Sequence, residues 1–203
     1  MLDSKPHKMP PRPTILISSS VYDKEDLLNQ VFATLDGIGY EVWMSDKGTM
    51  PVDPKLSAFD NCLIAVEKCD IFLGIISGFY GSGVDGSIDS ITHQELSKAI
   101  KLEKRRWFLV DHDVLVIRNF VKSVKKAEEK HGVEICSKLE LRQHDPISDM
   151  RILKMYDEAT RADLDLKDRV GNWVQNFRTT TDVLRFISAQ LGNPQRYLPP
   201  AAI

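Results

Sequence analysis

The chain has 203 residues, of which 42% are hydrophobic and 28% are charged, and this composition is typical of a globular protein. Its formal net charge is -2, which argues against a protein that binds duplex nucleic acid, because such proteins usually carry a basic excess. The three cysteines include no CxxC pair, which argues against a disulfide framework and against a structural metal site.

The first 12 residues are rich in proline and contain no apolar segment of the kind found in signal peptides. We expect residues 1–12 to form a disordered tail and residues 13–203 to form one domain. No apolar run approaches the roughly 20 residues needed to cross a bilayer. We therefore expect a cytoplasmic protein that does not bind membranes.

Short apolar runs predict the strands of a parallel sheet. Three nearly continuous runs are typical of strands covered on both faces, and they lie at residues 14–18 (TILIS), 70–76 (DIFLGII) and 107–110 (WFLV). Residues 40–45 (YEVWMS) alternate more strongly, which favours a strand at the edge of the sheet. A fifth strand is predicted at residues 172–177 (NWVQNF).

Helical patterns separate the apolar runs. Residues 23–38 carry an apolar stripe at helical spacing with Asp23 as the N-cap, and Ser57 would cap a second helix. The predicted helices between and after the strands lie at residues 23–38, 57–68, 92–103 and 181–191. This alternation predicts an α/β fold with a doubly wound, mainly parallel, five-stranded sheet of flavodoxin-like order.

Residues 112–169 fit this alternation least well. They predict helices at about residues 112–131 and 147–161, joined by a charged connection. We interpret residues 112–169 as a helical insertion between the fourth and fifth strands. Such an insertion would serve as a lid or as an interface.

Polar and aromatic side chains follow the predicted strands at their carboxyl ends. These ends share one edge of a parallel sheet, and ligands bind in the crevice there. The candidate binding residues are Ser18, Ser19, Ser20, Tyr22, Asp46, Phe79, Tyr80 and Asp111. Together they suit a ligand with sugar hydroxyls, phosphates and a flat base. The alternative is that the polar residues only form turns and the aromatic rings pack in the core.

Glu95 is the candidate catalytic residue. It borders the helical stripe that contains Leu96 and Ala99, one turn above the expected crevice. A carboxylate there could attack the anomeric carbon of a ribose or stabilise a developing oxocarbenium charge. The alternative is a capping box, in which Glu95 would bond the backbone amide of Thr92. His93, at a polar helix start, is expected to be solvated.

Two further motifs have weaker functional interpretations. Residues 81–86 (GSGVDG) match the GxGxxG pattern, but they do not follow the first strand or open directly into a helix. We interpret them as a loop. Residues 101–106 are the best candidate for a local basic patch.

Four segments together resemble a known family. They begin at PTILISSS, GYEVWMSD, SAFDNCLIAV and SITHQELSKAI and span about residues 13–110. Their order and spacing resemble the TIR-like domains of unknown function found at the N-terminus of NTPase and WD-repeat proteins and in short bacterial proteins. That family is distantly similar to TIR domains and to nucleoside 2-deoxyribosyltransferases.

The resemblance implies an N-glycosidase or ribosyl-transfer activity on NAD or a nucleotide, in a defence or signalling setting. Glu95 would act at the ribosyl–base bond, and Ser18, Ser19, Ser20 and Tyr22 would belong to a loop that contacts the ligand. In such an enzyme Asp46 and Asp111 would position ribose hydroxyls or assist proton transfer, and Phe79 or Tyr80 would hold the base. No metal or redox cofactor is required, and the relatives imply a homo-oligomer.

The alternative function is a non-catalytic signalling or assembly module that binds a nucleotide or a protein partner. A flavin-binding or phosphoryl-receiver function fits less well. A receiver needs an acidic pair after the first strand, and the first strand here ends in serines.

Overall fold

The computed structural model describes residues 11–20, 22, 24–83, 89–142 and 145–198. Its five strands are β1 (Thr14–Ser19), β2 (Glu41–Trp43), β3 (Ile71–Ile76), β4 (Arg105–Asp111) and β5 (Trp173–Phe177). They form one sheet in the order β2-β1-β3-β4-β5, and every neighbouring pair is parallel. This is the flavodoxin-like, doubly wound arrangement, so the predicted fold class is confirmed. The short strand β2 lies at the edge, as predicted.

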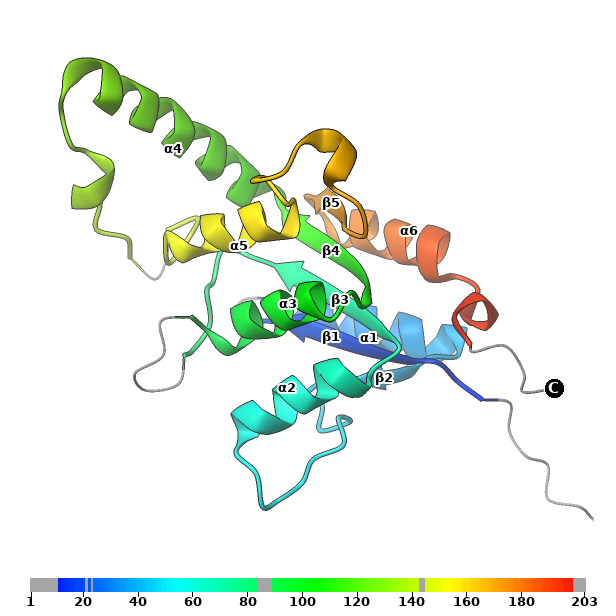
Figure 1. Ribbon diagram of the computed structural model, residues 1–203. Helices are drawn as coiled ribbons and strands as arrows, with labels where there is room; N and C mark the ends of the chain where they lie inside the picture. Colours follow the sequence, from blue (N-terminus) through cyan, green and yellow to red (C-terminus); the bar gives the residue numbers. More distant parts are fainter. Residues whose placement is uncertain (1–10, 21, 23, 84–88, 143–144, 199–203) are drawn as a thin grey trace, which may run out of the picture.

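Helices cover both faces of the sheet. The described helices are α1 (Glu25–Ile38), α2 (Ala58–Lys68), α3 (Ile91–Lys101), α4 (His112–His131), α5 (Arg151–Ala159) and α6 (Thr180–Leu191). Short 3-10 turns lie at Cys136–Lys138, Leu166–Asp168 and Pro194–Tyr197. Helices α1 and α6 cover one face, while α2, α3 and α5 cover the other (Figure 1). The two apolar layers between helices and sheet form the core.

The central strand β3 is buried along its whole length. Its side chains alternate between the two apolar layers, with Phe72 on the α3 side and Leu73 on the α1 side. Gly74 interrupts this apolar run because a Cβ there would lie 2.8 Å from the ring of Phe108 on β4. The glycine therefore permits close packing between neighbouring strands.

The ends of the helices agree only in part with the predictions. Ser57 caps α2 as predicted, since its hydroxyl accepts a hydrogen bond of 3.0 Å from the amide of Asp60. Helix α1 begins at Glu25 with Lys24 as its N-cap residue, and the predicted cap Asp23 lies outside the described residues. Residues 1–10 of the predicted tail and residues 84–86 of the GxGxxG motif also lie outside them.

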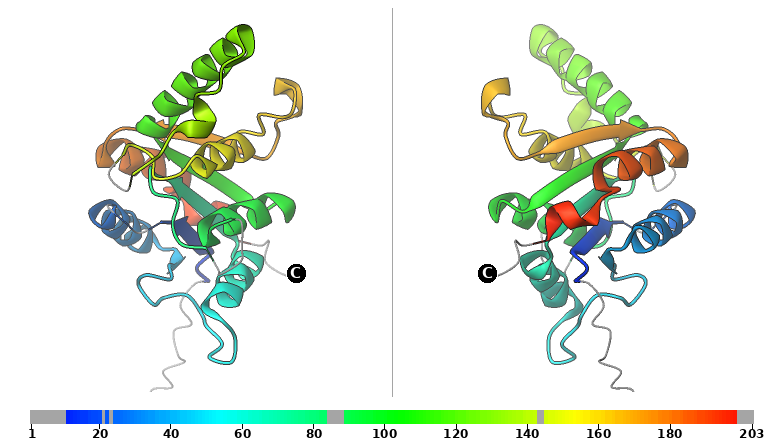
Figure 2. Two further views of the ribbon diagram at one scale, coloured as in Figure 1. Left: turned by 90° about the vertical axis from the view of Figure 1, so that its left-hand side faces the viewer. Right: turned by 90° about the vertical axis from the view of Figure 1, so that its right-hand side faces the viewer.

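The segment between β4 and β5 contains two different helices. Most of α4 projects away from the sheet into solvent, and only Val114 and Val121 are buried on it (Figure 2). Helix α5 instead lies beside α3, where Ile152 and Tyr156 belong to the core. Helix α5 is therefore part of the layer that covers the sheet. None of the helices in the described ranges is long and apolar enough to cross a membrane.

Candidate functional site

Glu95 points into the protein from the second turn of α3. The N-cap of α3 is Ser90, whose hydroxyl accepts a hydrogen bond of 3.3 Å from the amide of His93. The alternative interpretation, a capping box formed by Thr92 and Glu95, is therefore wrong, because the helix begins before Thr92. The Glu95 side chain is buried, with 6% of the residue exposed.

Three elements meet at the Glu95 carboxylate. The hydroxyl of Ser18, near the carboxyl end of β1, donates a hydrogen bond of 2.6 Å to Oε2 of Glu95. The thiol of Cys62, on α2, lies close to the same carboxylate and interacts with it. Ser18 and Cys62 are themselves buried, so the whole group lies at the border of the core.

Burial controls the protonation of this group. It raises the pKa of Glu95 from 4.5 to about 7, while the hydrogen bond from Ser18 and the interaction with the Cys62 thiol oppose the rise. Burial and the neighbouring Glu95 carboxylate raise the pKa of the Cys62 thiol to about 12. Near neutral pH the Glu95 carboxyl is therefore present in both protonation states, and a carboxyl with such a pKa suits proton transfer and nucleophilic chemistry.

A small pocket lies in front of the Glu95 carboxylate. Its walls are Leu16, Ile17, Ser18, Ser19, Met44, Ser45, Met50 and Glu95. Its volume is about 10 Å³, which is roughly the room that one water molecule needs. Met44 and Met50 come from the connection between β2 and α2 and are both buried. In this conformation the pocket has no room for a larger ligand.

A stacked aromatic pair lies at the same edge of the sheet. The ring of Tyr22, which is 61% exposed, stacks on the ring of Phe79 with a centroid distance of 4.8 Å. Ser20 holds the two connections together, because its hydroxyl donates a hydrogen bond of 2.7 Å to the carbonyl of Phe79. The hydroxyl of Ser19 donates to the carbonyl of Ser20, and Ser19 also lines the Glu95 pocket. The structure thus places Ser19, Ser20 and Tyr22, from the end of β1, beside Phe79.

Tyr80 and His93 form a separate, buried cluster. The Tyr80 hydroxyl lies 2.7 Å from Nδ1 of His93, and the guanidinium of Arg151 covers the Tyr80 ring at 4.4 Å. His93 is fully buried, and its Nε2 lies 3.2 Å from Oε2 of Glu158 without the geometry of a hydrogen bond. The expectation that His93 is solvated is therefore wrong. Helix α3 is flanked by both α2 and α5, so it buries a wider side than its apolar stripe indicates.

The other two candidate carboxylates have partners of their own. Asp46 forms an ion pair of 3.0 Å with the neighbouring Lys47. Asp111 caps α4 by accepting a hydrogen bond of 3.1 Å from the amide of Asp113, and it forms an ion pair of 2.9 Å with Lys24. Within the described ranges, no three His, Cys, Asp or Glu side chains lie close enough together to hold a metal ion.

Sequence reasoning missed Cys62 and Met50. Cys62 shares the buried side of α2 with Ala65 and Val66, and this spacing identifies it as a core residue but not as a neighbour of Glu95. Met50 lies in an irregular connection, where no periodic pattern predicts burial. Both assignments depend on contacts between elements that are distant in the sequence.

The chain belongs to a family described as a domain of unknown function (DUF4062), whose family model matches residues 14–183. No curated protein matches the chain significantly. Among solved structures, the chain is similar to the CMP N-glycosidase BcmB of Clostridium botulinum, with 13% sequence identity and a TM-score of 0.44. The alignment covers 87% of this chain and 98% of that chain. A similarity of this size carries no conclusion about the activity of the present chain.

Proposed function

We propose that this member of the DUF4062 family is an N-glycosidase or ribosyl-transfer domain that acts on NAD or a nucleotide, with Glu95 as its catalytic carboxylate. The observation that carries the proposal is the buried pair of Ser18 and Glu95 at the carboxyl edge of the sheet. The TIR-like resemblance of the sequence around Glu95 supports the same assignment and is part of the proposal.

Cleavage of an N-glycosidic bond develops positive charge on the anomeric carbon while electrons pass to the leaving base. An ionised Glu95 would stabilise this charge, or would attack the carbon and form an ester that water or another acceptor then opens. The hydrogen bond from Ser18 holds one carboxylate oxygen in a fixed orientation. In a buried site a fixed charge stabilises the transition state more strongly than it would in water.

The groups beside Glu95 suggest how a substrate would lie. The exposed ring of Tyr22, which stacks on Phe79, offers a flat surface for the base. The hydroxyl of Ser19 would bond the ribose, because Ser19 lines the pocket in front of Glu95. Asp46 and Asp111 would take part only after leaving their present ion pairs. Movement of the connection that carries Met50 would admit the substrate.

A specific observation favours the second candidate, a non-catalytic signalling or assembly module. The pocket in front of Glu95 is about 10 Å³ and holds no ligand of nucleotide size in this conformation. Helix α4 also exposes two apolar side chains, Val116 at 48% and Phe120 at 61%. In this function Glu95 would only hold α3 against β1, and α4 would contact a partner.

Base release distinguishes the two functions. The purified chain is incubated with NAD and with a set of nucleotides and nucleosides, and free base is measured by chromatography over a range of protein concentrations. The enzyme hypothesis predicts release by the wild type and its loss in Glu95→Gln. Absence of release from every substrate at every concentration would favour the assembly module.

A further inference from the structure

Helix α4 carries two different rows of side chains. One row packs against the rest of the chain through Val114 and Val121, which are buried. A second row, spaced alternately three and four residues apart, is exposed along the whole helix. We call this row the outer stripe, and its members are Asp113, Val116, Phe120, Ser123, Ala127 and Lys130. The same spacing marks the contact positions of a coiled coil, so the outer stripe suits contact with another helix.

The middle of the outer stripe consists of apolar or small side chains. Val116 is 48% exposed and Phe120 is 61% exposed, and they lie one turn apart on the same side of the helix. The hydroxyl of Ser123 donates a hydrogen bond of 3.1 Å to the carbonyl of Asn119, so it already has an acceptor within α4. The middle of the outer stripe can therefore be buried without leaving the Ser123 hydroxyl unpaired.

The two ends of the outer stripe carry opposite charges. Asp113 lies in the first turn of α4, and Lys130 lies in the last turn. Neither has an oppositely charged residue three or four positions away within α4, which is the spacing of helical ion pairs. Both charges suit the macrodipole of α4 itself. They also give the outer stripe one acidic end and one basic end.

The outer stripe is complementary to a second outer stripe that runs in the opposite direction. In an antiparallel pair of α4 helices whose register is centred on the middle of the stripe, each charge meets the opposite charge and each larger apolar side chain meets a smaller one. The facing pairs are Asp113 with Lys130, Val116 with Ala127, and Phe120 with Ser123. The antiparallel macrodipoles also attract each other. A two-fold axis produces this arrangement from two identical copies.

The position of α4 leaves its outer part accessible. Most of the helix projects from the sheet into solvent (Figure 2). Lys122, Lys125 and Lys126 make its surface basic, which would also attract an anionic lipid surface. A membrane-bound stripe, however, would not place a carboxylate in line with its apolar side chains, as Asp113 is placed here. The charges of the outer stripe therefore favour a second copy of the chain.

We propose that the outer stripe is a dimer interface, on which α4 of a second copy of this chain packs in the antiparallel direction. The proposal names the partner and the contact of the assembly module considered above. It is equally compatible with an enzyme, because Glu95 lies on α3. An interface made by one pair of helices is small, so we expect reversible association that depends on protein concentration.

Analytical ultracentrifugation of the full chain measures the dissociation constant of the dimer. The wild type should dimerise reversibly. Phe120→Asp should raise the dissociation constant by about a hundredfold or more, because it replaces the largest apolar side chain of the outer stripe by a charge near the two-fold axis. Since the Phe120 side chain is largely exposed, this variant should fold, and thermal unfolding checks that it does.

Charge reversal tests the direction of the pairing. Asp113→Lys and Lys130→Glu should each raise the dissociation constant by about tenfold, because each change creates two pairs of like charges in the symmetric dimer. The double variant exchanges the charges and should dimerise within about threefold of the wild type. Loss of the helix would have the opposite pattern, because both changes oppose the macrodipole and would add in the double variant.

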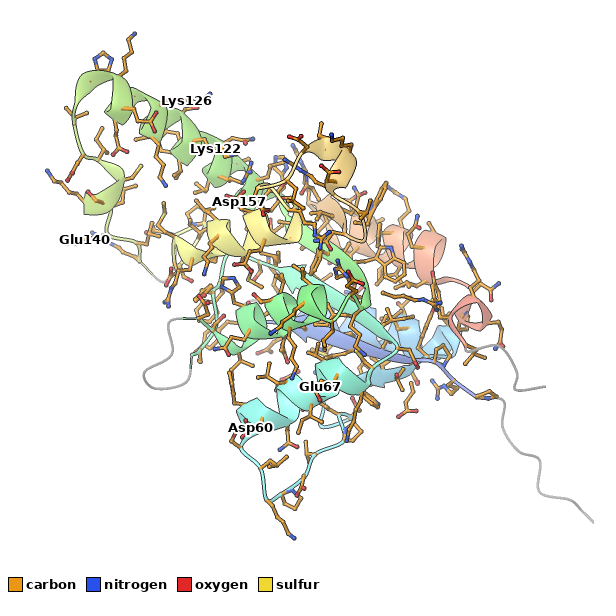
Figure 3. All side chains as sticks on the ribbon, in the orientation of Figure 1. Asp60, Glu67, Lys122, Lys126, Glu140 and Asp157 are labelled. Atoms are coloured by element: carbon orange, nitrogen blue, oxygen red, sulfur yellow. The ribbon has the colours of Figure 1, made fainter. Side chains whose placement is uncertain are left out.

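The matched control is Lys122→Glu, which makes the same change as Lys130→Glu at an exposed position off the outer stripe (Figure 3). Lys122→Glu should dimerise like the wild type, and so should Glu95→Gln, so the failure of the proposed enzyme would leave this test unaffected. The proposal is overturned by a wild type that stays monomeric up to about 1 mM. Unchanged dimerisation in Phe120→Asp would overturn it, as would a double variant weaker than both single reversals. A monomeric wild type that binds anionic phospholipid vesicles would assign the outer stripe to a lipid surface instead.

Discussion

The hydroxyl of Ser18 on β1 donates a hydrogen bond of 2.6 Å to Oε2 of Glu95 on α3. This bond joins the central part of the sheet to the helix that follows β3, and it fixes a carboxylate whose pKa burial raises to about 7. The orientation and the protonation of Glu95 are thus set by the same buried environment.

Ser18→Ala should raise the pKa of Glu95 further, because it removes a hydrogen bond that favours the ionised carboxylate. Ser18→Thr keeps a hydroxyl and should leave this pKa closer to that of the wild type. Titration of the labelled glutamate carboxyl carbons by NMR would follow the change directly. A lower pKa in Ser18→Ala would contradict the assigned hydrogen bond.

Glu95 should make the protein less stable as the pH rises. Between about pH 4.5 and pH 7 the native state keeps a proton on Glu95 that the unfolded chain loses, so the unfolding free energy falls over this range. The pKa difference corresponds to a fall of about 3 kcal/mol. In Glu95→Gln this fall should be absent, and urea unfolding at about pH 5 and about pH 8 measures it against the wild type.

The control for this pH dependence is Glu67→Gln on α2, labelled in Figure 3. Its carboxylate is 52% exposed and pairs with Lys98, which lowers its pKa. Glu67→Gln should therefore retain the fall in stability between the two pH values. Equal falls in the wild type and in Glu95→Gln would show that Glu95 titrates normally.

Ser90, rather than Thr92, should stabilise the start of α3. Ser90→Ala removes the N-cap hydroxyl that accepts a hydrogen bond from the amide of His93 and should lower the unfolding free energy by about 1 kcal/mol. Thr92→Ala should change the unfolding free energy by less than about 0.5 kcal/mol. Urea unfolding of both variants compares them. A larger loss of unfolding free energy in Thr92→Ala than in Ser90→Ala would instead support the capping box of Thr92 and Glu95.

The apolar runs predicted the order and the burial of the strands better than their ends. Strand β4 begins at Arg105, two residues before the predicted run, because a charged side chain such as Arg106 can be buried when its guanidinium finds hydrogen-bond acceptors. Helix α5 begins at Arg151 rather than near residue 147, where the backbone of Ser148 instead donates to the carbonyl of Gly78. A periodic pattern of apolar residues does not reveal where a hydrogen bond to another element replaces a helical hydrogen bond.

The sequence predicted those residues of the candidate site that lie at the carboxyl edge of the parallel sheet. Ser18 was identified from its place at the carboxyl end of β1 and Glu95 from its place on the helix that follows β3, and the structure joins them by a hydrogen bond. Tyr80 shows the limit of this reasoning: side-chain direction beyond a strand end is not periodic, and the Tyr80 ring is turned into the core. Cys62 required knowledge of how α2 packs beside α3.

The three thiols should differ in their reactivity. Burial is the largest cause that raises the pKa of Cys62 to about 12 and of Cys69 to about 11, while Cys136 is only partly buried. A disulfide reagent at about pH 8 should therefore modify Cys136 first, because the thiolate is the reactive form and access is required. Spectroscopic counting of modified thiols in the wild type and in Cys136→Ser measures this order. Fast modification in Cys136→Ser would mean that Cys62 or Cys69 is accessible.

The most direct test of Glu95 as the catalytic carboxylate is the rate of base release from NAD and from nucleotides by three proteins measured together. These are the wild type, Glu95→Gln and the surface control Glu67→Gln, each shown to be folded. Our account predicts equal release by the wild type and Glu67→Gln, and a loss of about a hundredfold or more in Glu95→Gln. Release by Glu95→Gln at the rate of the wild type, or no release by the wild type from any substrate, would contradict it.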